Sequence, residues 1–452
     1  MTVATLYAGL KGKLVGDTGT VAWTVVFLNV MRIVNSAILT RLLTAEAFGV
    51  VGIITSVAVT FGLLSDIGIA AFMVRHKDSD DPRFIDELWT LRMIRSIVLT
   101  LGVAIASGPI SAYLGKPELQ WAIAAGGLIF LFDAIDSMAF FGALRNQQVK
   151  RLNKIDIINQ VAGVVLSIVI AFLLRSYWAI MIANLLGQLF RAYMSYSMFP
   201  GSGRRWRFSK ARATELWSFS RFITGSTMLS LVIGQTDKVA LSKLFPLEMF
   251  GLYMLASNLA GAPAILASTY ASRILYPRFA KTAREAPATI AKHFYDQRLQ
   301  TTLLYALAVG GVFACAPLIV TLIYDDRYLP AIFYFRVLLV SSFFIMNNFA
   351  TNEVMIAIGQ QKFTLQANIV RLIYLVVGGF IGYQTGGPTG LVIVVGAIEA
   401  AAQVFSWYCL FRERILDVRK EALILIAGVG GLVLGYGANL AGLGLLAMWS
   451  IG

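Results

Sequence analysis

Arginine residues recur inside the apolar stretches of this 452-residue chain. A charge in apolar surroundings is costly unless it is paired or holds a ligand. The guanidinium group suits phosphate in particular, because it binds phosphate oxygens through paired, charge-assisted hydrogen bonds. These arginines therefore predict a site for an anion such as a phosphate group, or else structural groups that reach toward the segment end or pair with a carboxylate. The first candidates are Arg32 and Arg371, and the second are Arg336, Arg92 and Arg95, nearer the segment ends.

Amides and hydroxyls accompany the two leading arginines at helical spacing. Asn29, Arg32 and Ser36 follow one another at i, i+3 and i+7, and Asn368 precedes Arg371 by three residues. Residues at this spacing share one face of a helix. One polar stripe on an otherwise apolar helix is expected beside a water-filled cavity. The predicted polar lining of such a cavity consists of Asn29, Ser36, Asn348, Asn352, Asn368 and Gln403.

Carboxylates in the apolar stretches are candidates for coupling to a proton or a sodium ion. Burial makes a carboxyl group easier to protonate near neutral pH. Asp133 and Asp136 share one helix face and would repel each other, which favours one of them holding a proton. Structural pairing is the alternative, as for Asp237 beside Lys238. The candidates for ion coupling are Asp133, Asp136, Asp237 and Glu399, and coupling to no ion at all is also open.

Residues typical of enzyme chemistry are sparse. The two histidines, His76 and His293, lack metal-ligand spacing, and no phosphate-binding P-loop occurs. Cys315 and Cys409 are single residues inside apolar runs, so neither a disulfide framework nor a thiolate metal site is expected. The chain is predicted not to be an enzyme and to hold no metal or other cofactor, apart from a coupled proton or sodium ion.

The elements that position these residues are predicted to be membrane-spanning helices. The chain is 58% apolar with a mean hydropathy of +0.73, and only 14% of its residues are charged, against about 25% in a soluble domain. A helix needs about 20 apolar residues to cross a bilayer. Uncharged stretches near or above that length are residues 47–65, 96–115, 249–272, 299–324, 372–398 and 422–452.

Twelve spanning helices are predicted, in two sets of six. The first set covers residues 18–42, 47–74, 88–114, 119–145, 155–174 and 177–199, and the second covers 215–243, 248–276, 296–324, 329–358, 363–384 and 388–411. Basic residues support this count, because they cluster in alternate connections, as cytoplasmic loops do. The other connections carry single basic residues, namely Arg41, Lys116, Arg175, Lys243 and Arg327. The N-terminus is therefore expected in the cytoplasm.

The predicted organisation has four parts: a lobe at 1–199, a basic cytoplasmic linker at 200–213, a second lobe at 214–411, and a hydrophobic extension at 412–452 with one or two helices. The net charge of +14 belongs largely to loops, where it can face anionic lipid head groups. The linker GSGRRWRFSKAR also contains Trp206, but a nucleic-acid partner is not expected.

A similar sequence motif occurs once in each set of helices. Leu39–Val50 reads LTRLLTAEAFGV, and Leu241–Leu252 reads LSKLFPLEMFGL. Each motif lies at the end of the first helix of its set and runs into the second. Two repeats with an even number of spans are related by an axis along the membrane normal, an arrangement that suits a transporter with its substrate site between the halves.

Three segments resemble a known family: TRLLTAEAFGV, LLSDIGIAAFMVR (63–75) and GQTDKVALSKLFPLEMFGLY (234–253). They are similar to the polysaccharide exporter family of Wzx-type flippases for lipid-linked oligosaccharides, whose superfamily includes the MATE drug antiporters and the lipid II flippases. The resemblance implies an all-α, MATE-like membrane fold of twelve core helices plus one or two at the C-terminus. It also implies that undecaprenyl-pyrophosphate-linked oligosaccharide crosses the bacterial inner membrane by alternating access, for exopolysaccharide, capsule or O-antigen.

On this interpretation Arg32 and Arg371 bind the pyrophosphate. The expected partners are the lipid-linked substrate, membrane lipids, and the polymerase and export proteins of the same pathway, and the protein is expected to be a monomer. A MATE-like cation-coupled antiporter is the alternative, and it predicts cation-binding acids without cavity arginines. A membrane-bound polymerase or ligase would need a large outward loop, whereas every outward connection predicted here is short.

Overall fold

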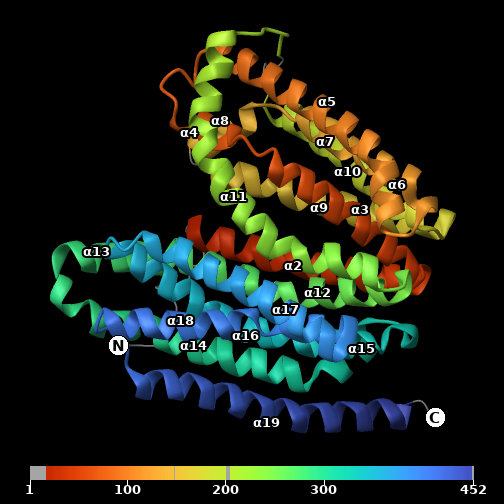
Figure 1. The fold of residues 1–452 in the computed structure, drawn as a ribbon. Coiled ribbons are helices and arrows are strands. Elements are labelled where there is room, and N and C mark those ends of the chain that lie inside the picture. The colour runs from red at the N-terminus through yellow and green to blue at the C-terminus, as the bar shows by residue number, and fades with distance from the viewer. Residues whose placement is uncertain (1–16, 147, 200–203, 450–452) are drawn as a thin grey trace, which may run out of the picture. The chain divides into compact units, whose positions relative to one another are not determined.

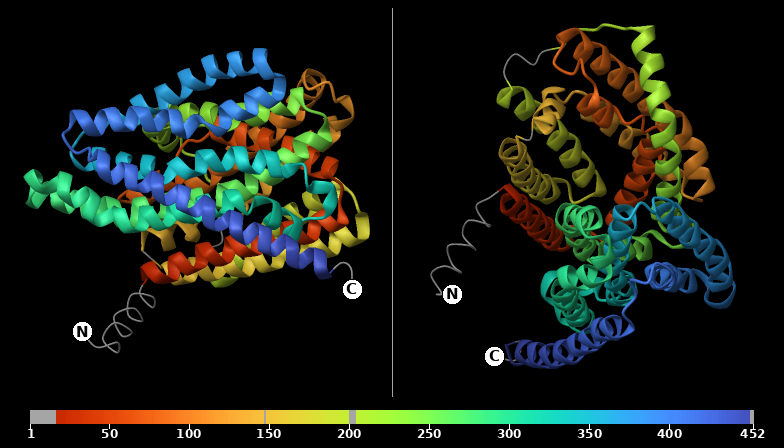
Figure 2. Two further views of the ribbon diagram at one scale, coloured as in Figure 1. Left: turned by 90° about the horizontal axis from the view of Figure 1, so that it is seen from below. Right: turned by 90° about the vertical axis from the view of Figure 1, so that its left-hand side faces the viewer.

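The computed structural model describes residues 17–146, 148–199 and 204–449. All regular structure in these ranges is helical (Figures 1 and 2). The chain packs as two units, Met1–Glu248 and Met249–Gly452.

The first unit contains the helices of the first predicted set and one more. Its packing joins α9 to α2 and α10, α5 to α6 and α7, and α3 to α6, α10 and α11. Its elements are α2 (Asp17–Leu42), α3 (Ala45–Leu64), α4 (Ile69–Arg75), α5 (Pro82–Tyr113), η1 (Pro117–Leu119), α6 (Gln120–Gly126), α7 (Leu128–Ala134), α8 (Ala139–Arg145), α9 (Val149–Leu174), α10 (Tyr177–Met198) and α11 (Lys210–Leu244).

The extra helix, α11, opens the second set in the sequence but packs with the first unit. The described part of the linker explains this placement. Trp206 packs edge-on against Trp89 of α5 at 5.1 Å between ring centroids, and the Arg207 backbone N–H donates to Thr90 Oγ1 at 2.9 Å. Beyond the linker, α11 packs against α3. The packing boundary therefore differs from the predicted lobe boundary by one helix.

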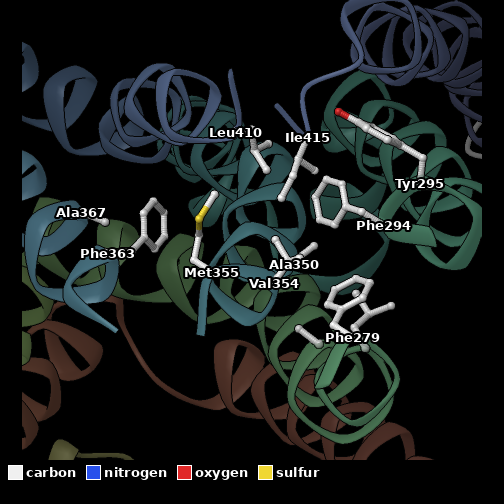
Figure 3. Close-up of a cluster of buried hydrophobic side chains, with 12 residues drawn as sticks. Phe279, Phe294, Tyr295, Ala350, Val354, Met355, Phe363, Ala367, Leu410 and Ile415 are labelled. Atoms are coloured by element: carbon white, nitrogen blue, oxygen red, sulfur yellow. The ribbon is translucent and has the colours of Figure 1, made fainter. Parts of the chain in front are cut away.

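The second unit holds the remaining helices around an apolar core. Aromatic and aliphatic side chains from α13, α14, α16, α17 and α18 fill this core, among them Phe279, Phe294, Val354 and Phe363 (Figure 3). The elements are α12 (Leu247–Tyr270), the π-helical turn η2 (Ala271–Leu275), α13 (Tyr276–Glu285), η3 (Pro287–Thr289), α14 (Ile290–Ala314), α15 (Ala316–Ile323), η4 (Asp326–Tyr328), α16 (Ala331–Ala357), α17 (Lys362–Gly396), α18 (Ile398–Arg412) and α19 (Val418–Trp449).

Several long helices are bent at specific residues. The pair Pro117–Ala134 and Ala139–Arg145 bends by 62°, and the pair Pro287–Ala314 and Ala316–Ile323 bends by 68°. Inside α17, Gly387 has φ 59° and ψ −147° and precedes Pro388. Glycine tolerates a positive φ and proline has no N–H to donate to the preceding turn. This break separates the two predicted helices at 363–384 and 388–411.

Eight helices in the described residues are long and apolar enough to cross a membrane, or up to ten if each bent pair is one span. Helical structure covers most of each predicted segment, but 47–74 is divided into α3 and α4, 119–145 into η1, α6, α7 and α8, and 296–324 into α14 and α15. Two predicted segments, 177–199 and 215–243, form α10 and α11, and these helices are not among the ten possible spans. Two others, 363–384 and 388–411, lie in α17 and α18, which together count as one of the ten. The C-terminal extension forms one continuous helix, α19.

Helices α14 and α19 approach each other closely through glycine (Figure 1). A methyl group at Gly310 would overlap the carbonyl oxygen of Gly428, and one at Gly431 would overlap that of Leu307. A methyl group at Gly435 would likewise meet the Gly311 carbonyl. Small residues at this spacing let the backbones of two membrane helices pack directly. The glycines of the extension therefore serve helix packing and do not divide it into two helices.

Candidate functional site

Two adjoining cavities lie within the first unit. The first, here called the charged cavity, has a volume of about 410 Å³ and is lined by residues of α3, α5, α6, α7 and α10, including Arg95 and Asp133. The second, here called the amide cavity, has a volume of about 350 Å³ and is lined by residues of α2, α7, α9 and α10. Ile129, Asn184 and Gln188 line both cavities. One turn of α10 thus forms the wall that the two cavities share.

The amide cavity is polar but its lining contains no charged side chain. Ser167 Oγ donates to Asn35 Oδ1 at 2.6 Å across it, from α9 to α2. Asn159 Oδ1 and Gln188 Oε1 are buried and have no hydrogen-bond partner among the described residues. The polar lining consists of Asn35, Asn159, Gln160, Ser167, Asn184 and Gln188. These residues were not predicted from the sequence. The i, i+4 spacing of Asn184 and Gln188, which places them on one helix face, was a signal for them.

The predicted coupling acids of the first set are paired with arginines. Arg92 Nη2 donates to Asp133 Oδ2 at 3.0 Å and to the Asp133 carbonyl at 2.6 Å. Arg191 Nε lies 3.3 Å from Asp136 Oδ2. The two arginines also lie over aromatic rings, Arg92 over Phe141 and Arg191 over Phe140. The expected repulsion between Asp133 and Asp136 is therefore offset by a cation beside each acid. Arg191 was not among the predicted site residues.

Arg95 borders the charged cavity, but its N–H groups donate to the C-terminal end of α3. Its Nε donates to the Ser65 carbonyl at 2.8 Å, and its Nη2 donates to the Gly62 carbonyl at 3.0 Å and to Ser65 Oγ at 2.9 Å. The last carbonyls of a helix lack intrahelical partners and carry partial negative charge. Arg95 therefore caps the C-terminus of α3 and adds positive charge to the cavity wall.

Arg32 has a different environment from these paired arginines. Its side chain is exposed, and its Nη2 donates to Asn29 Oδ1 at 2.7 Å on the same face of α2. Ser36 is half-buried one turn further along this face. No ion pair to Arg32 occurs among the residues that the structure describes. Its charge is therefore accompanied only by a neutral amide in that part of the chain.

In the second unit, four predicted residues form one network. Arg371 of α17 binds both carboxylate oxygens of Glu399 of α18, at 2.9 and 2.7 Å. Asn368 Oδ1 accepts a further bond from Arg371 at 3.2 Å. Asn348 of α16 donates to Glu399 Oε2 at 2.7 Å, and Ser406 donates to Asn348 Oδ1 at 2.9 Å. A bidentate pair of this kind is strong and geometrically specific. The guanidinium of Arg371 is therefore already bound to a carboxylate.

The remaining predicted residues lie apart from that network's ion pair. Asn352 accepts from Thr364 Oγ1 at 2.7 Å, and Arg336 donates to the Phe313 carbonyl at 3.2 Å. Gln403 is almost fully buried, and its amide has no partner among the described residues. Asp237 is buried in α11, 3.8 Å from Lys238 Nζ.

A second buried network in this unit was not predicted. Arg298 of α14 is fully buried and forms an ion pair with Glu421 of α19. Its Nη1 donates to Asn347 Oδ1 at 2.8 Å. Tyr295 Oη and Trp407 Nε1 donate to the two oxygens of Glu421 at 2.9 and 3.0 Å. A signal was present in the sequence, since Glu421 is the only acid between residues 418 and 449.

Comparison with solved structures places this architecture in a known class. The lipid II flippase MurJ in an inward closed conformation aligns with a TM-score of 0.71 at 12% identity, covering 94% of this chain and 92% of MurJ. A multidrug resistance MATE family transporter in an inward-facing conformation aligns with a TM-score of 0.63 at 16% identity, covering 88% of this chain and 95% of that one. The fold is therefore the MATE-like fold of membrane transporters, as predicted.

The family follows from the sequence comparison. The family model of polysaccharide biosynthesis proteins matches residues 38–333, so the chain belongs to this family. The succinoglycan biosynthesis transport protein ExoT of Rhizobium meliloti is 21% identical over 62% of this chain and 56% of its own length. The teichuronic acid biosynthesis protein TuaB of Bacillus subtilis is 20% identical over 68% and 63%. The lipopolysaccharide biosynthesis protein WzxC of Escherichia coli is 20% identical over 84% and 77%.

The matches to ExoT and TuaB thus span less than two thirds of those relatives. The predicted family resemblance and fold class are confirmed, and the chain is a multi-pass membrane protein. The family and fold are those of transporters and not of enzymes, in agreement with the sequence analysis.

Proposed function

We propose that this protein translocates an oligosaccharide linked to undecaprenyl pyrophosphate across the bacterial inner membrane, by alternating access, for exopolysaccharide, capsule or O-antigen synthesis. The observation that carries the proposal is membership of the polysaccharide biosynthesis family on a transporter fold. The alternation of basic loops supports a cytoplasmic N-terminus. The proposed partners are membrane lipids and the polymerase and export proteins of the same pathway, and the protein acts as a monomer.

Arg32 is the leading candidate for binding the pyrophosphate. A guanidinium group that already donates to a carboxylate must give up that pairing before the same N–H groups can bind a phosphate. Arg371 is in this position because of Glu399, and Arg92 because of Asp133. The exposed guanidinium of Arg32, with Asn29 beside it, is open to a second anion. Arg336, which donates only to a carbonyl among the described residues, is the next candidate.

Arg371 enters the same proposal through its partner. A proton on Glu399 removes the negative charge that holds the guanidinium, so protonation makes Arg371 available to pyrophosphate. Deprotonation restores the pair and favours release of the anion. Glu399 is therefore the proposed coupling acid in the second unit, with Asp133 and Asp136 as the paired acids of the first unit and Asp237 as a further candidate.

The test measures lipid-linked sugar that accumulates facing the cytoplasm in cells that carry Arg32→Ala. We expect accumulation, with export lowered by about tenfold or more, which corresponds to about 1.4 kcal/mol of lost interaction. Arg32→Lys keeps the charge and is expected to retain part of the export. Arg327→Ala, at an exposed arginine of η4, is the matched control and is expected to export normally. Full export by Arg32→Ala would remove this site from the proposal.

A MATE-like antiporter is the alternative function, and the similarity of the fold to a MATE transporter supports it. The two functions differ in the charge expected near the substrate. A cation antiporter needs free carboxylates, whereas Asp133, the acid that lines the charged cavity, is paired with Arg92, and no acid lines the amide cavity. Extrusion of a cationic dye by proteoliposomes that hold the purified protein would favour the antiporter over the flippase.

A further inference from the structure

The amide cavity of the first unit contains none of the residues proposed to bind pyrophosphate or to couple export to an ion. Four helices border it, and its lining carries no charge. Its volume of about 350 Å³ falls in the usual range for small-ligand pockets, about 300 to 1,000 Å³. Leu39, Val164 and Ile180 supply apolar wall between the amides. A cavity of this composition suits a neutral ligand that is rich in hydroxyl groups and also has apolar C–H faces.

Two buried acceptors give the cavity an unmet hydrogen-bonding capacity. Asn159 Oδ1 on α9 and Gln188 Oε1 on α10 lack a partner among the described residues, and buried polar atoms normally have one. A carbonyl oxygen of an amide accepts from a hydroxyl donor, while the amide NH₂ donates to hydroxyl oxygens. Sugar hydroxyls are both donors and acceptors, so neighbouring amides can bind them in pairs.

Glycine residues keep this space open. Gly163 of α9 and Gly187 of α10 both line the cavity, and a Cβ built at either would meet nothing within 4 Å. Neither glycine has a positive φ, so the backbone does not require glycine there. Larger side chains at these two positions would project into open space, and their absence leaves the volume for another occupant.

We propose that the amide cavity binds a neutral glycosyl unit of the lipid-linked substrate, with Asn159 and Gln188 accepting hydrogen bonds from its hydroxyl groups. This inference rests on the proposed function. Asn184 and Gln188 also line the charged cavity, so a longer glycan can continue past them toward Arg95 and Asp133. The cavity is then a determinant of which sugar is exported, separate from the arginine that binds the pyrophosphate.

The test uses the full chain in lipid nanodiscs and two probes. One is lipid-linked oligosaccharide extracted from cells that lack this protein, and the other is undecaprenyl pyrophosphate without sugar. Affinity is measured for the wild type and for Asn159→Leu, Gln188→Leu and the cavity-filling Gly163→Leu. We expect the glycosylated probe to bind the wild type at least tenfold more tightly than the bare lipid. In the three variants that advantage should fall to threefold or less, with unchanged affinity for the bare lipid.

Two matched controls separate this effect from damage to the fold. Asn153→Leu makes the same change on α9 at a residue that does not line the cavity, and Gly437→Leu adds the same bulk at an exposed glycine of α19. Both should keep the wild-type preference for the glycosylated probe.

The outcomes distinguish this inference from the function on which it rests. Equal affinity of the wild type for the two probes, or an intact preference in all three cavity variants, would overturn the sugar site while leaving a lipid pyrophosphate flippase in place. Failure of the wild type to bind either probe would instead overturn the proposed function. Retention of the preference by the amide variants but not by Gly163→Leu would assign the cavity to shape alone and contradict the roles of Asn159 and Gln188.

Discussion

Two buried networks of the second unit consist of polar side chains that bind one another, whereas a set of amides in the first unit lines a cavity. Arg371 with Glu399 and Arg298 with Glu421 are each held by further amides, hydroxyls or rings of neighbouring helices. In the amide cavity, by contrast, buried oxygens of α9 and α10 lack partners among the described residues. A closed network fixes the helices that contribute to it, while an open polar wall has capacity for a ligand or for water.

This difference has an energetic consequence. Removing one partner of a buried ion pair leaves the other charge uncompensated, at a cost of about 3 to 5 kcal/mol. Replacing an amide that has no protein partner by an apolar group of similar size is nearly neutral. Substitutions in the closed networks should therefore lower stability first, and substitutions in the amide cavity should change binding first.

The largest effect is expected at Glu421. Glu421→Ala strands the fully buried Arg298 and frees Tyr295 and Trp407, so the unfolding free energy should fall by about 3 to 5 kcal/mol. Thermal unfolding of the purified protein in detergent measures this as a lower Tm. The double variant Arg298→Met with Glu421→Leu removes both charges and should recover most of the loss. A double variant as unstable as Glu421→Ala would show that the ion pair is not the source.

A smaller loss is expected where α14 and α19 touch. Gly431→Leu inserts a side chain against the Leu307 carbonyl, and overpacking of this kind costs about 1 to 3 kcal/mol. Gly430→Leu is the matched control, because a Cβ at that neighbouring residue meets nothing within 4 Å. The Tm of the first variant should fall and that of the second should not. Equal values would mean that α19 does not depend on the glycine contact.

The network of Arg371 offers a test that separates structure from substrate binding. Arg371→Ala leaves Glu399 with its amide partner only and should destabilise the protein by about 1 to 3 kcal/mol, the cost of an unsatisfied buried group. Adding Glu399→Gln should restore the Tm. If Arg371 binds pyrophosphate, or if Glu399 is the coupling acid, export stays low in the restored double variant. Recovery of export together with the Tm would make Arg371 a packing residue alone.

Much of the helix map follows from the sequence, because hydrophobicity and basic loops are local signals. Helical structure covers most of the twelve predicted segments, although several are broken into shorter helices, and the break at Gly387–Pro388 lies between two of them. The partners of the candidate site residues were harder to predict, because ion pairs and hydrogen bonds between helices depend on which helices lie side by side. Spacing along one helix indicated that Asn368 and Arg371 share a face, yet it could not indicate that Glu399 and Asn348 face them. The amides of α9 and α10 were missed for the same reason, because the sequence does not show which helices together border a cavity.

The smallest effect is expected near the start of α11, which is not among the helices long and apolar enough to cross a membrane. Glu215 accepts hydrogen bonds from Arg212 at 2.6 Å and from His76 at 2.9 Å. Burial alone would raise the pKa of this carboxyl, but the hydrogen bond to His76 and the charge of Arg212 outweigh it, so the pKa is lowered. A lowered folded-state pKa stabilises the protein above the ordinary pKa of glutamate, and this contribution is lost as the pH falls through the lowered value.

Because 44% of the Glu215 side chain is exposed, solvent screens the interaction and the contribution is small. Glu215→Gln should therefore lower the Tm slightly at pH 7. The difference from the wild type should shrink once the pH falls below the ordinary pKa of glutamate and vanish below the lowered pKa of Glu215. The measurement is the Tm of both proteins across that pH series. A difference that persists at the lowest pH would assign the effect to lost packing and not to the charge on Glu215.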